Sequence, residues 1–221
     1  IPEPAFQKQI NRPKDLAPPL PLWNERASQG PLVGHVSDHE AILWARVPEA
    51  GSYELALQPN DDSTVVHRVT AVANEDDDWC LRWIATGLQA DTVYKYRIQR
   101  KTEALWQGDD FHFRTAPDPN SPARVTLVFG SCASSKPSTI WNRIKQEGAD
   151  GVVLLGDTPY IDVTDLARVR DAYRRFSSVA PLAETFRSIP FWGTWDDHDF
   201  GRNDSDGTLP GKEYSRRGFV N

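Results

Sequence analysis

The chain has 221 residues, of which 39% are hydrophobic and 25% are charged, a composition typical of a folded globular protein. Its net charge of −6 and isoelectric point near 5.4 argue against a nucleic-acid scaffold as partner, because such proteins neutralise phosphates with an excess of lysine and arginine. No apolar run approaches the roughly 18 residues that a membrane helix needs, so no transmembrane segment is expected.

The first half of the chain predicts an arm followed by a β-sandwich. Residues 1–28 hold six prolines without a sustained hydrophobic period, which predicts an extended arm. From 29 to 115, short alternating runs separated by turn signals predict strands. The expected strands are 41–47, 53–57, 65–72, 79–84, 93–98 and 111–113. This density of short strands predicts an all-β sandwich of immunoglobulin or fibronectin type.

Several polar residues of this domain have structural interpretations. Leu88 leads into a turn and Tyr94 follows it, as in the tyrosine corner of fibronectin-type domains, so Tyr94 is expected to bond back to the turn. The acidic run 76–78 is expected to be a solvated turn. Cys80 is expected in the core, without a disulfide to Cys132. Four histidines do not cluster in the sequence and are expected at the surface or at strand edges: His35, His39, His67 and His112.

The second half predicts an α/β domain. Residues 116–123 hold three prolines and predict a linker. Residues 124–221 then alternate strand runs at 125–130, 152–155 and 189–193 with helices starting near 137, 164 and 181. The end of the chain, 212–221, resembles the start of a further helix. This alternation predicts a parallel sheet with helices packed against it.

Potential metal ligands follow each predicted strand of the second half. Cys132 follows the first, Asp157 and Tyr160 follow the second, and the run Asp-Asp-His-Asp at 196–199 follows the third. Open α/β sheets place their sites at the carboxyl ends of their strands. Carboxylates suit hard cations and a phenolate binds ferric iron, so a metal centre is the favoured interpretation.

Two alternatives belong to other classes. Cys132 could be a nucleophile with His198 as its base, since His198 is the one histidine after the linker. That pair leaves Asp157 and Asp197 unexplained, whereas metal binding accounts for them. In a non-catalytic binding module, the acidic run would simply be solvated.

The residues after the acidic run offer little further chemistry. An EF-hand-like pattern in 202–213 is rejected because Arg202 occupies a position that requires a carboxylate. Nearby cations could hold a substrate oxyanion or form ordinary surface charge. They are Arg202, Lys212, Arg216 and Arg217.

Three motifs in order carry a family resemblance: Phe-Gly-Ser-Cys at 129–132, Leu-Gly-Asp-Thr-Pro-Tyr at 155–160, and Trp-Asp-Asp-His-Asp-Phe-Gly-Arg-Asn-Asp at 195–204. Behind a β-sandwich, they resemble the PhoD-type alkaline phosphatases, relatives of the purple acid phosphatases in the calcineurin-like metallophosphatase superfamily. The resemblance implies hydrolysis of small phosphate esters, monoesters or diesters, by a metal-activated water. It also implies a binuclear centre of Fe(III) and Ca(II), with other divalent metals possible, and a periplasmic or secreted location.

The resemblance further implies residue roles. His198 would stabilise or protonate the leaving group, and Asp199 would orient His198. The superfamily takes further ligands from a C-terminal half, so the resemblance implies that 124–221 is an incomplete α/β metallophosphatase domain, inactive alone. The implied metal ligands are Cys132, Asp157, Tyr160 and Asp197.

Overall fold

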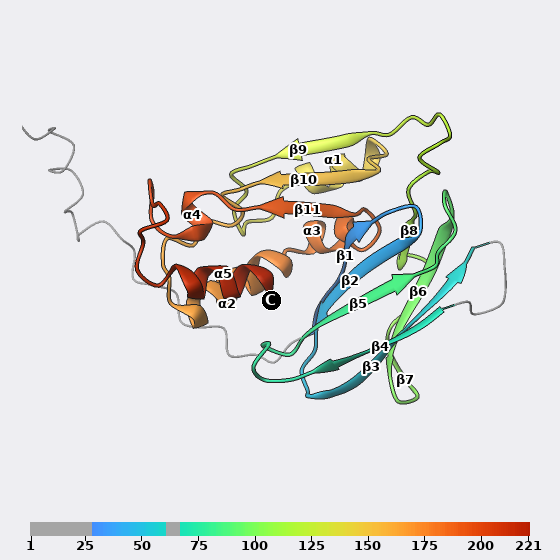
Figure 1. Ribbon diagram of the computed structural model, residues 1–221, viewed down its shortest axis with the longest axis horizontal. Helices are drawn as coiled ribbons and strands as arrows, with labels where there is room; N and C mark the ends of the chain where they lie inside the picture. The colour runs from blue at the N-terminus through green and yellow to red at the C-terminus, as the bar shows by residue number, and fades with distance from the viewer. Residues whose placement is uncertain (1–27, 61–66) are drawn as a thin grey trace, which may run out of the picture.

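A computed structural model describes residues 28–60 and 67–221 (Figure 1). All of the predicted arm except residue 28 lies outside these ranges. The first two positions of the strand predicted at 65–72 also lie outside them.

The first part of the described chain is a sandwich of two antiparallel sheets. One is three-stranded, in the order β1-β2-β5, and the other is five-stranded, in the order β4-β3-β6-β7 with β8 also paired to β6. The strands are β1 (Gln29–Val36), β2 (Glu40–Arg46), β3 (Gly51–Pro59), β4 (His67–Ala73), β5 (Cys80–Thr86), β6 (Val93–Arg100), β7 (Glu103–Trp106) and β8 (His112–Arg114).

Alternating side chains build the core between the two sheets. In β5, Leu81, Trp83 and Ala85 are buried, while the residues between them are exposed. The Trp83 indole N–H donates to the Tyr53 carbonyl of the opposite sheet at 3.1 Å, so this buried donor is paired. The period-two pattern therefore predicted the inward face of this strand correctly.

The tyrosine corner is confirmed. The Gln89 backbone N–H donates to the Tyr94 hydroxyl at 2.9 Å, and Leu88 is buried beside this turn. The sequence pattern missed two strands, β1 and β7. In β1, Gly30, Pro31 and Gly34 interrupt the apolar alternation, and β7 is short with no fully buried residue.

The second part is a parallel sheet with helices, as predicted. β9 (Leu127–Gly130), β10 (Gly151–Leu155) and β11 (Phe191–Thr194) pair in the order β11-β10-β9. The helices are α1 (Ile140–Gln146), α2 (Leu166–Ser177), α3 (Ala180–Phe186), α4 (Asp197–Phe200) and α5 (Lys212–Val220). Strands and helices alternate along the chain in the order β9-α1-β10-α2-α3-β11, and this alternation predicted the parallel sheet.

Helix α2 shows why its sequence folds as it does. Asp165 caps the helix by accepting a hydrogen bond from the Arg168 N–H at 3.0 Å. Val169 and Phe176 are buried, and basic residues fill the last turn, where they oppose the negative end of the helix dipole. The helix was predicted to start near residue 164, but it starts at Leu166, after the Asp165 cap.

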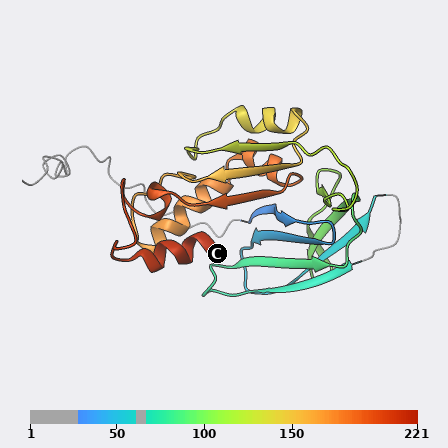
Figure 2. The ribbon, with the colours of Figure 1, turned by 45° about the horizontal axis from the view of Figure 1, so that its top comes forward.

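A second hydrophobic core lies between the parallel sheet and its helices, and two sandwich residues, Leu32 and the partly buried Trp44, pack in it. The Trp141 ring packs edge-on against the rings of Phe176 and Phe186, with centroids 6.1 and 5.6 Å apart. Leu32 of β1 belongs to this cluster, and β1 contacts both α3 and β11. Figures 1 and 2 show β1 lying beside this layer, so the two parts share a packed boundary.

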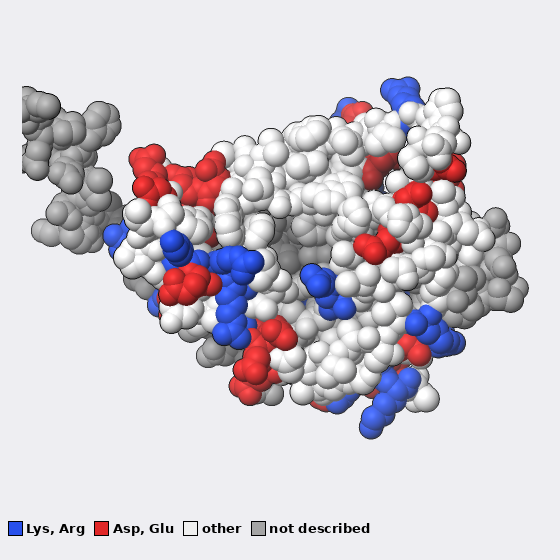
Figure 3. Space-filling model, viewed as in Figure 1, with Lys and Arg blue, Asp and Glu red and all other residues white. Residues whose placement is uncertain are grey.

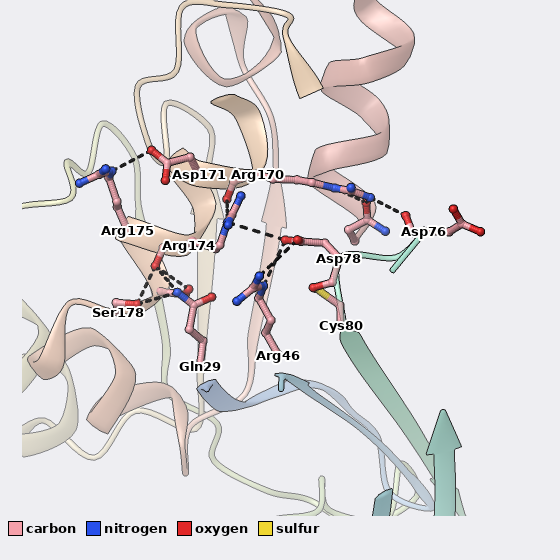
Figure 4. A network of polar contacts seen from close by, with 12 residues as sticks. Gln29, Arg46, Asp76, Asp78, Cys80, Arg170, Asp171, Arg174, Arg175 and Ser178 are labelled. Carbon is pink, nitrogen blue, oxygen red and sulfur yellow. Dashed lines mark hydrogen bonds and ion pairs between the residues drawn. The ribbon is translucent and has the colours of Figure 1, made fainter. Parts of the chain in front are cut away.

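A buried ionic network also joins the two parts (Figure 4). Asp78, 7% exposed, accepts hydrogen bonds from both Nε and Nη2 of Arg46, at 3.2 and 3.3 Å. Arg174 of α2 lies 3.7 Å from the same carboxylate. We call these three residues the interface network. The expectation that 76–78 is a solvated turn was therefore wrong for Asp78, because the second domain supplies an arginine that the local sequence does not reveal.

Further polar contacts surround the interface network. The Gln29 amide donates to the Arg174 carbonyl at 2.9 Å and to the Ser178 hydroxyl at 2.8 Å. Arg170 and Arg217 each donate to the Asp76 carbonyl, at 2.7 and 2.8 Å. Helices α2 and α5 are thus tied to one turn of the sandwich.

Candidate metal centre

The carboxyl ends of β9, β10 and β11 meet at one edge of the parallel sheet, and the loops leaving them interlock. The Cys132 N–H donates to the Gly156 carbonyl at 3.2 Å. Gly156 has φ of +99°, and a Cβ there would lie 2.5 Å from the Asp196 Cβ, so only glycine allows this approach. The glycine after β10 therefore brings the second loop against the third.

Two of the predicted ligands adopt left-handed backbone conformations. Cys132 has φ of +59° and Asp157 has φ of +51°. This region is disfavoured for residues with a Cβ, and such strain concentrates at functional sites. The backbone thus turns sharply after each strand and directs these two side chains to the same edge.

The structure brings the predicted ligands together. Ligand atoms of Asp157, Asp197 and His198 all lie within 4.8 Å of one another. The Cys132 sulfur lies 3.7 Å from Asp157 Oδ2, and the Tyr160 ring lies 4.7 Å from the His198 ring, centroid to centroid. We call these five residues the strand-end cluster.

Asp196 and Asp199 have structural partners instead. The Asp196 side chain accepts the Asp197 N–H at 3.0 Å, and Asp199 Oδ1 accepts the Asp196 N–H at 2.6 Å, which forms a capping box at the start of α4. Asp199 Oδ2 accepts the Thr158 N–H at 3.2 Å, and burial raises the pKa of this carboxyl group. Both oxygens of Asp199 are therefore engaged by backbone donors.

The carboxylate that holds the His198 ring is Asp162, and the sequence prediction is corrected on this point. His198 Nδ1 lies 2.5 Å from Asp162 Oδ1, whereas Asp199 makes only the backbone contacts described above. This hydrogen bond raises the pKa of His198. Asp162 lies two positions after Tyr160, but the sequence carries no signal that the chain returns to His198 at this point.

Negative charge dominates the electrostatics of the strand-end cluster. The Asp204 N–H donates to Asp197 Oδ2 at 2.5 Å, and this bond, with the nearby imidazole, lowers the pKa of Asp197. The hydrogen bond to Cys132 and the charge of Asp157 raise the pKa of Tyr160, whose side chain is exposed. A phenolate at this position therefore needs a positive charge close by.

The donor set fits a metal centre. It combines carboxylates, a thiol, a phenol and an imidazole, which are ligands for hard and borderline cations. Throughout residues 28–60 and 67–221, neither Asp157 nor Asp197 forms an ion pair with lysine or arginine. Two half-buried carboxylates without a basic partner are costly unless a cation balances them.

Two of the predicted cations and three of the remaining histidines have partners outside the cluster. Figure 3 shows acidic side chains gathered over α4 and basic ones over α5. Lys212 donates to the Gly207 carbonyl, and Arg217 to the sandwich, so their contacts are structural. His35 accepts a hydrogen bond from the Trp192 indole at 3.1 Å. The His39 ring contacts the Asp38 carboxylate, and the His112 ring contacts the Asp109 backbone carbonyl. No histidine of the sandwich joins a metal-binding group among the described residues.

Two cavities of the described structure lie elsewhere. One, of about 620 Å³, runs along the linker, and another, of about 290 Å³, lies between α2, α5 and the first sheet of the sandwich. Neither is lined by Asp157, Asp197 or His198. Cys132 and Tyr160 are both exposed, so these two members of the strand-end cluster lie open to solvent.

The fold and site define a β-sandwich joined to a parallel α/β layer that carries a candidate metal centre. Residues 23–117 match the family model of the PhoD-like phosphatase N-terminal domain. A solved structure of PhoD is similar, with a TM-score of 0.75 and 20% identity, covering 86% of this chain and 44% of that chain. These findings confirm the resemblance to PhoD-like phosphatases. The chain spans less than half the length of the PhoD structure.

Two weaker likenesses cover less than half of the chain. The sensor domain of the anti-sigma factor RsgI4 in Pseudobacteroides cellulosolvens is 12% identical, with a TM-score of 0.32, covering 46% of this chain and 93% of that chain. The FN5 domain of Drosophila Lar is 14% identical, with a TM-score of 0.31, covering 41% and 96%. No curated protein matches the sequence. Within the described residues, no helix has the length and apolar character needed to cross a membrane.

Proposed function

We propose that the chain is the N-terminal part of a metal-dependent phosphatase that hydrolyses small phosphate esters. The convergence of Asp157, after β10, with Asp197 and His198, after β11, carries this proposal. The match to the PhoD-like phosphatase N-terminal domain and the likeness to PhoD support it. An acidic edge without basic partners would repel a phosphate ester, so substrate binding at this place requires bound cations.

The residues of the strand-end cluster divide the work. Asp157 would contact both metals, with Cys132 and Tyr160 on an Fe(III) ion and Asp197 on a Ca(II) ion. The metals, when bound, supply a hydroxide nucleophile at neutral pH and positive charge for the phosphoryl oxygens. His198 would give a proton to the leaving-group oxygen. Asp196 and Asp199 would keep α4, and with it His198, in place through the capping box.

The geometry favours this function over a Cys-His hydrolase. Cys132 contacts a carboxylate, Asp157, and a phenol, Tyr160, and in the described chain it has no bond to the His198 imidazole. The Nδ1 atom of His198 is engaged by Asp162. A nucleophilic thiol needs a base within hydrogen-bond reach. The contacts of Cys132 are with a carboxylate and a phenol, which are both suited to metal binding.

We also propose that a C-terminal portion completes the centre and that the protein is exported. Asp157 and Asp197 alone would hold the second cation weakly, which calls for further ligands. The shorter span relative to PhoD supports this view. Activity on p-nitrophenyl phosphate by residues 1–221 alone would contradict the first point. An initiating Met immediately upstream of Ile1, with no leader, would contradict the second.

Metal content and visible absorption test the proposal. Full-length protein purified without chelators is expected to hold iron and to absorb in the visible through charge transfer from Tyr160 to Fe(III). Tyr160→Phe should lose the band, whereas Tyr214→Phe, an exposed tyrosine on α5, should keep it. Absence of bound metal in the wild-type protein would contradict the proposal.

Thiol labelling gives a readout that is independent of activity. Cys132 is exposed, whereas burial raises the pKa of Cys80 to about 12 and suppresses its thiolate. A maleimide should therefore label Cys132 first, and added metal should protect it. Cys80 serves as the internal control, since metal should leave its slow labelling unchanged. Equal labelling of Cys132 with and without metal would exclude it as a ligand.

A further inference from the structure

The cavity of about 290 Å³ between α2, α5 and the first sheet of the sandwich is largely apolar. Its walls include Phe176 of α2, Phe186 of α3 and Phe219 of α5, and its volume corresponds to on the order of ten water molecules. Water in such a space finds few hydrogen-bond partners, so an apolar occupant is favoured. The interface network also lines this cavity, which therefore lies at the boundary between the two parts of the molecule (Figure 4).

Two polar atoms at this cavity are buried without a hydrogen-bond partner among the described residues, Gln29 Oε1 and the Tyr173 hydroxyl. Gln29 is 5% exposed, and its amide nitrogen donates to the Arg174 carbonyl and the Ser178 hydroxyl. The amide oxygen therefore lies on the side away from these partners, as Figure 4 shows. A buried oxygen that accepts no hydrogen bond is costly. The occupant should thus combine apolar surface with an N–H donor.

The proline-rich arm meets the cavity at its C-terminal end. The described chain begins at residue 28, and the next residue, Gln29, lines the cavity. Trp23 precedes Gln29 by six positions, and an extended chain of that length spans about 20 Å, so Trp23 is within reach of the cavity. The match to the PhoD-like phosphatase N-terminal domain also begins at residue 23, which includes residues 23–28 in the matched domain.

Residues 19–23 have the composition that such an occupant needs. Their sequence is Pro-Leu-Pro-Leu-Trp, so they have large apolar side chains and no charge. Pro19 and Pro21 have no backbone N–H, which leaves fewer donors to bury in an apolar space. Proline-rich chains favour an extended form whose carbonyl groups make no internal hydrogen bonds and can accept from a hydroxyl. Trp23 adds a large ring with one N–H donor.

We propose that residues 19–23 dock in this cavity, with the Trp23 ring against α2 and α5 and its indole N–H donating to Gln29 Oε1. The Tyr173 hydroxyl donates to a carbonyl group of the same segment. Docked in this way, the arm joins the sandwich to α2 and α5 and adds to the contact that β1 makes with α2. This proposal does not depend on the proposed function, because none of the five residues of the strand-end cluster lines the cavity.

Thermal unfolding of the full-length, metal-free protein tests the contribution of Trp23. Trp23→Ala should lower Tm by about 5 °C, because a large buried ring and a hydrogen bond are lost. Trp23→Phe keeps an aromatic ring without the donor and should lower Tm less. Phe6→Ala removes an aromatic residue of the arm outside the docked segment, so this matched control should leave Tm unchanged. A Tm of Trp23→Ala equal to that of the wild type overturns the proposal.

Photo-crosslinking reports where the segment lies, whatever its effect on stability. The photoreactive amino acid p-benzoylphenylalanine, placed at position 23 of the full-length protein, should cross-link within its own chain to peptides from α2 or α5. The same group at position 6 should not cross-link to these helices. Cross-links from position 23 that join two chains would show that a second copy fills the cavity. Cross-links only to other parts of the chain, or none, would show that the segment does not dock there, and each of these results overturns the proposal.

The reactivity of Cys80 gives a further readout, because Cys80 lines the same cavity. Its labelling by a maleimide should be slow in the full-length protein, since burial raises the pKa of this thiol and the docked arm covers it. Trp23→Ala should raise the rate of Cys80 labelling about tenfold at a temperature where the protein stays folded, and Phe6→Ala should not. Cys132 should react at the same rate in all three metal-free proteins. An unchanged rate for Cys80 in Trp23→Ala would show that the arm does not cover the cavity, and the proposal would be wrong.

Discussion

The interface network and the strand-end cluster both gather ionisable side chains, but their charges are balanced in opposite ways. In the interface network, Asp78 is 7% exposed and lies between two guanidinium groups, Arg46 and Arg174. In the strand-end cluster, Asp157 and Asp197 converge without a lysine or arginine partner in the described residues. The first arrangement is balanced within the protein, whereas we propose that a bound cation balances the second.

This difference separates stabilising charge from functional charge. A buried carboxylate that is paired with arginine has its charge balanced. Removing one partner leaves an unpaired charge in the interior and destabilises the fold. Convergent carboxylates without a counter-ion destabilise the fold until a cation binds. Stability measurements should therefore respond in opposite directions to substitutions at the two places.

The largest expected effect is at Asp157. Asp157→Asn in the full-length protein should lower phosphatase activity about a thousandfold, because bound metals lower the activation barrier by several kcal/mol. Without metal, the Asp157→Asn variant should be at least as stable as the metal-free wild type, because one of the mutually repelling carboxylates is gone. Thermal unfolding with and without metal measures both. A large loss of stability in the metal-free variant would place Asp157 with Asp78 as a structural residue.

Asp78→Asn should destabilise the fold by about 3 kcal/mol, because Arg46, 2% exposed, would lose its charged partner. Urea unfolding at neutral pH measures the change. Asp77→Asn is the matched control, since Asp77 lies in the same turn but is exposed. A change at Asp78 no larger than that at Asp77 would show that the network contributes nothing to the boundary.

A neutral buried hydrogen bond should matter less than the ionic network. Tyr94→Phe removes the hydroxyl that accepts the Gln89 N–H, and we expect a loss of about 1 kcal/mol. Denaturant unfolding gives the value, with Tyr214→Phe on the exposed face of α5 as control. A loss equal to that of Asp78→Asn would remove the distinction between charged and neutral pairs in this protein.

An exposed ion pair sets the lower limit of the comparison. Asp91 pairs with Arg114 at 2.7 Å, with side chains 57% and 59% exposed. Asp91→Asn should change the free energy of unfolding by less than about 0.5 kcal/mol, because water screens such pairs. Asparagine also tolerates the positive φ of this position, which avoids a backbone effect. A change above that of Tyr94→Phe would contradict this ordering.

The fold was largely predictable because each layer repeats a simple period. Alternation in β5 and β6 and the Tyr94 corner are local signals, and the parallel sheet followed from the order of strands and helices. β1 was missed because its glycines and proline break the alternation, and its packing against α3 depends on contacts far along the chain. Long-range packing of this kind leaves no local periodicity.

For the site, the sequence located the residues but not all of their partners. Cys132, Asp157 and the acidic run were found because each follows an apolar strand. Asp162 was missed, and Asp199 was given its task, because which carboxylate meets an imidazole depends on how two loops cross. The burial of Asp78 was likewise set by Arg174, which is 96 positions away along the chain. The metal roles themselves remain predictions.

The placement of Leu32 has a consequence for how the protein can be divided. Leu32 is a residue of the sandwich, yet it is buried in the core of the parallel layer with Trp141 and Phe186. The proline-rich stretch 117–122 is exposed or half-exposed and would be an accessible target for a protease. Cleavage there would cut the chain without parting this core, so the two pieces should elute together as a nicked protein until denaturant is added.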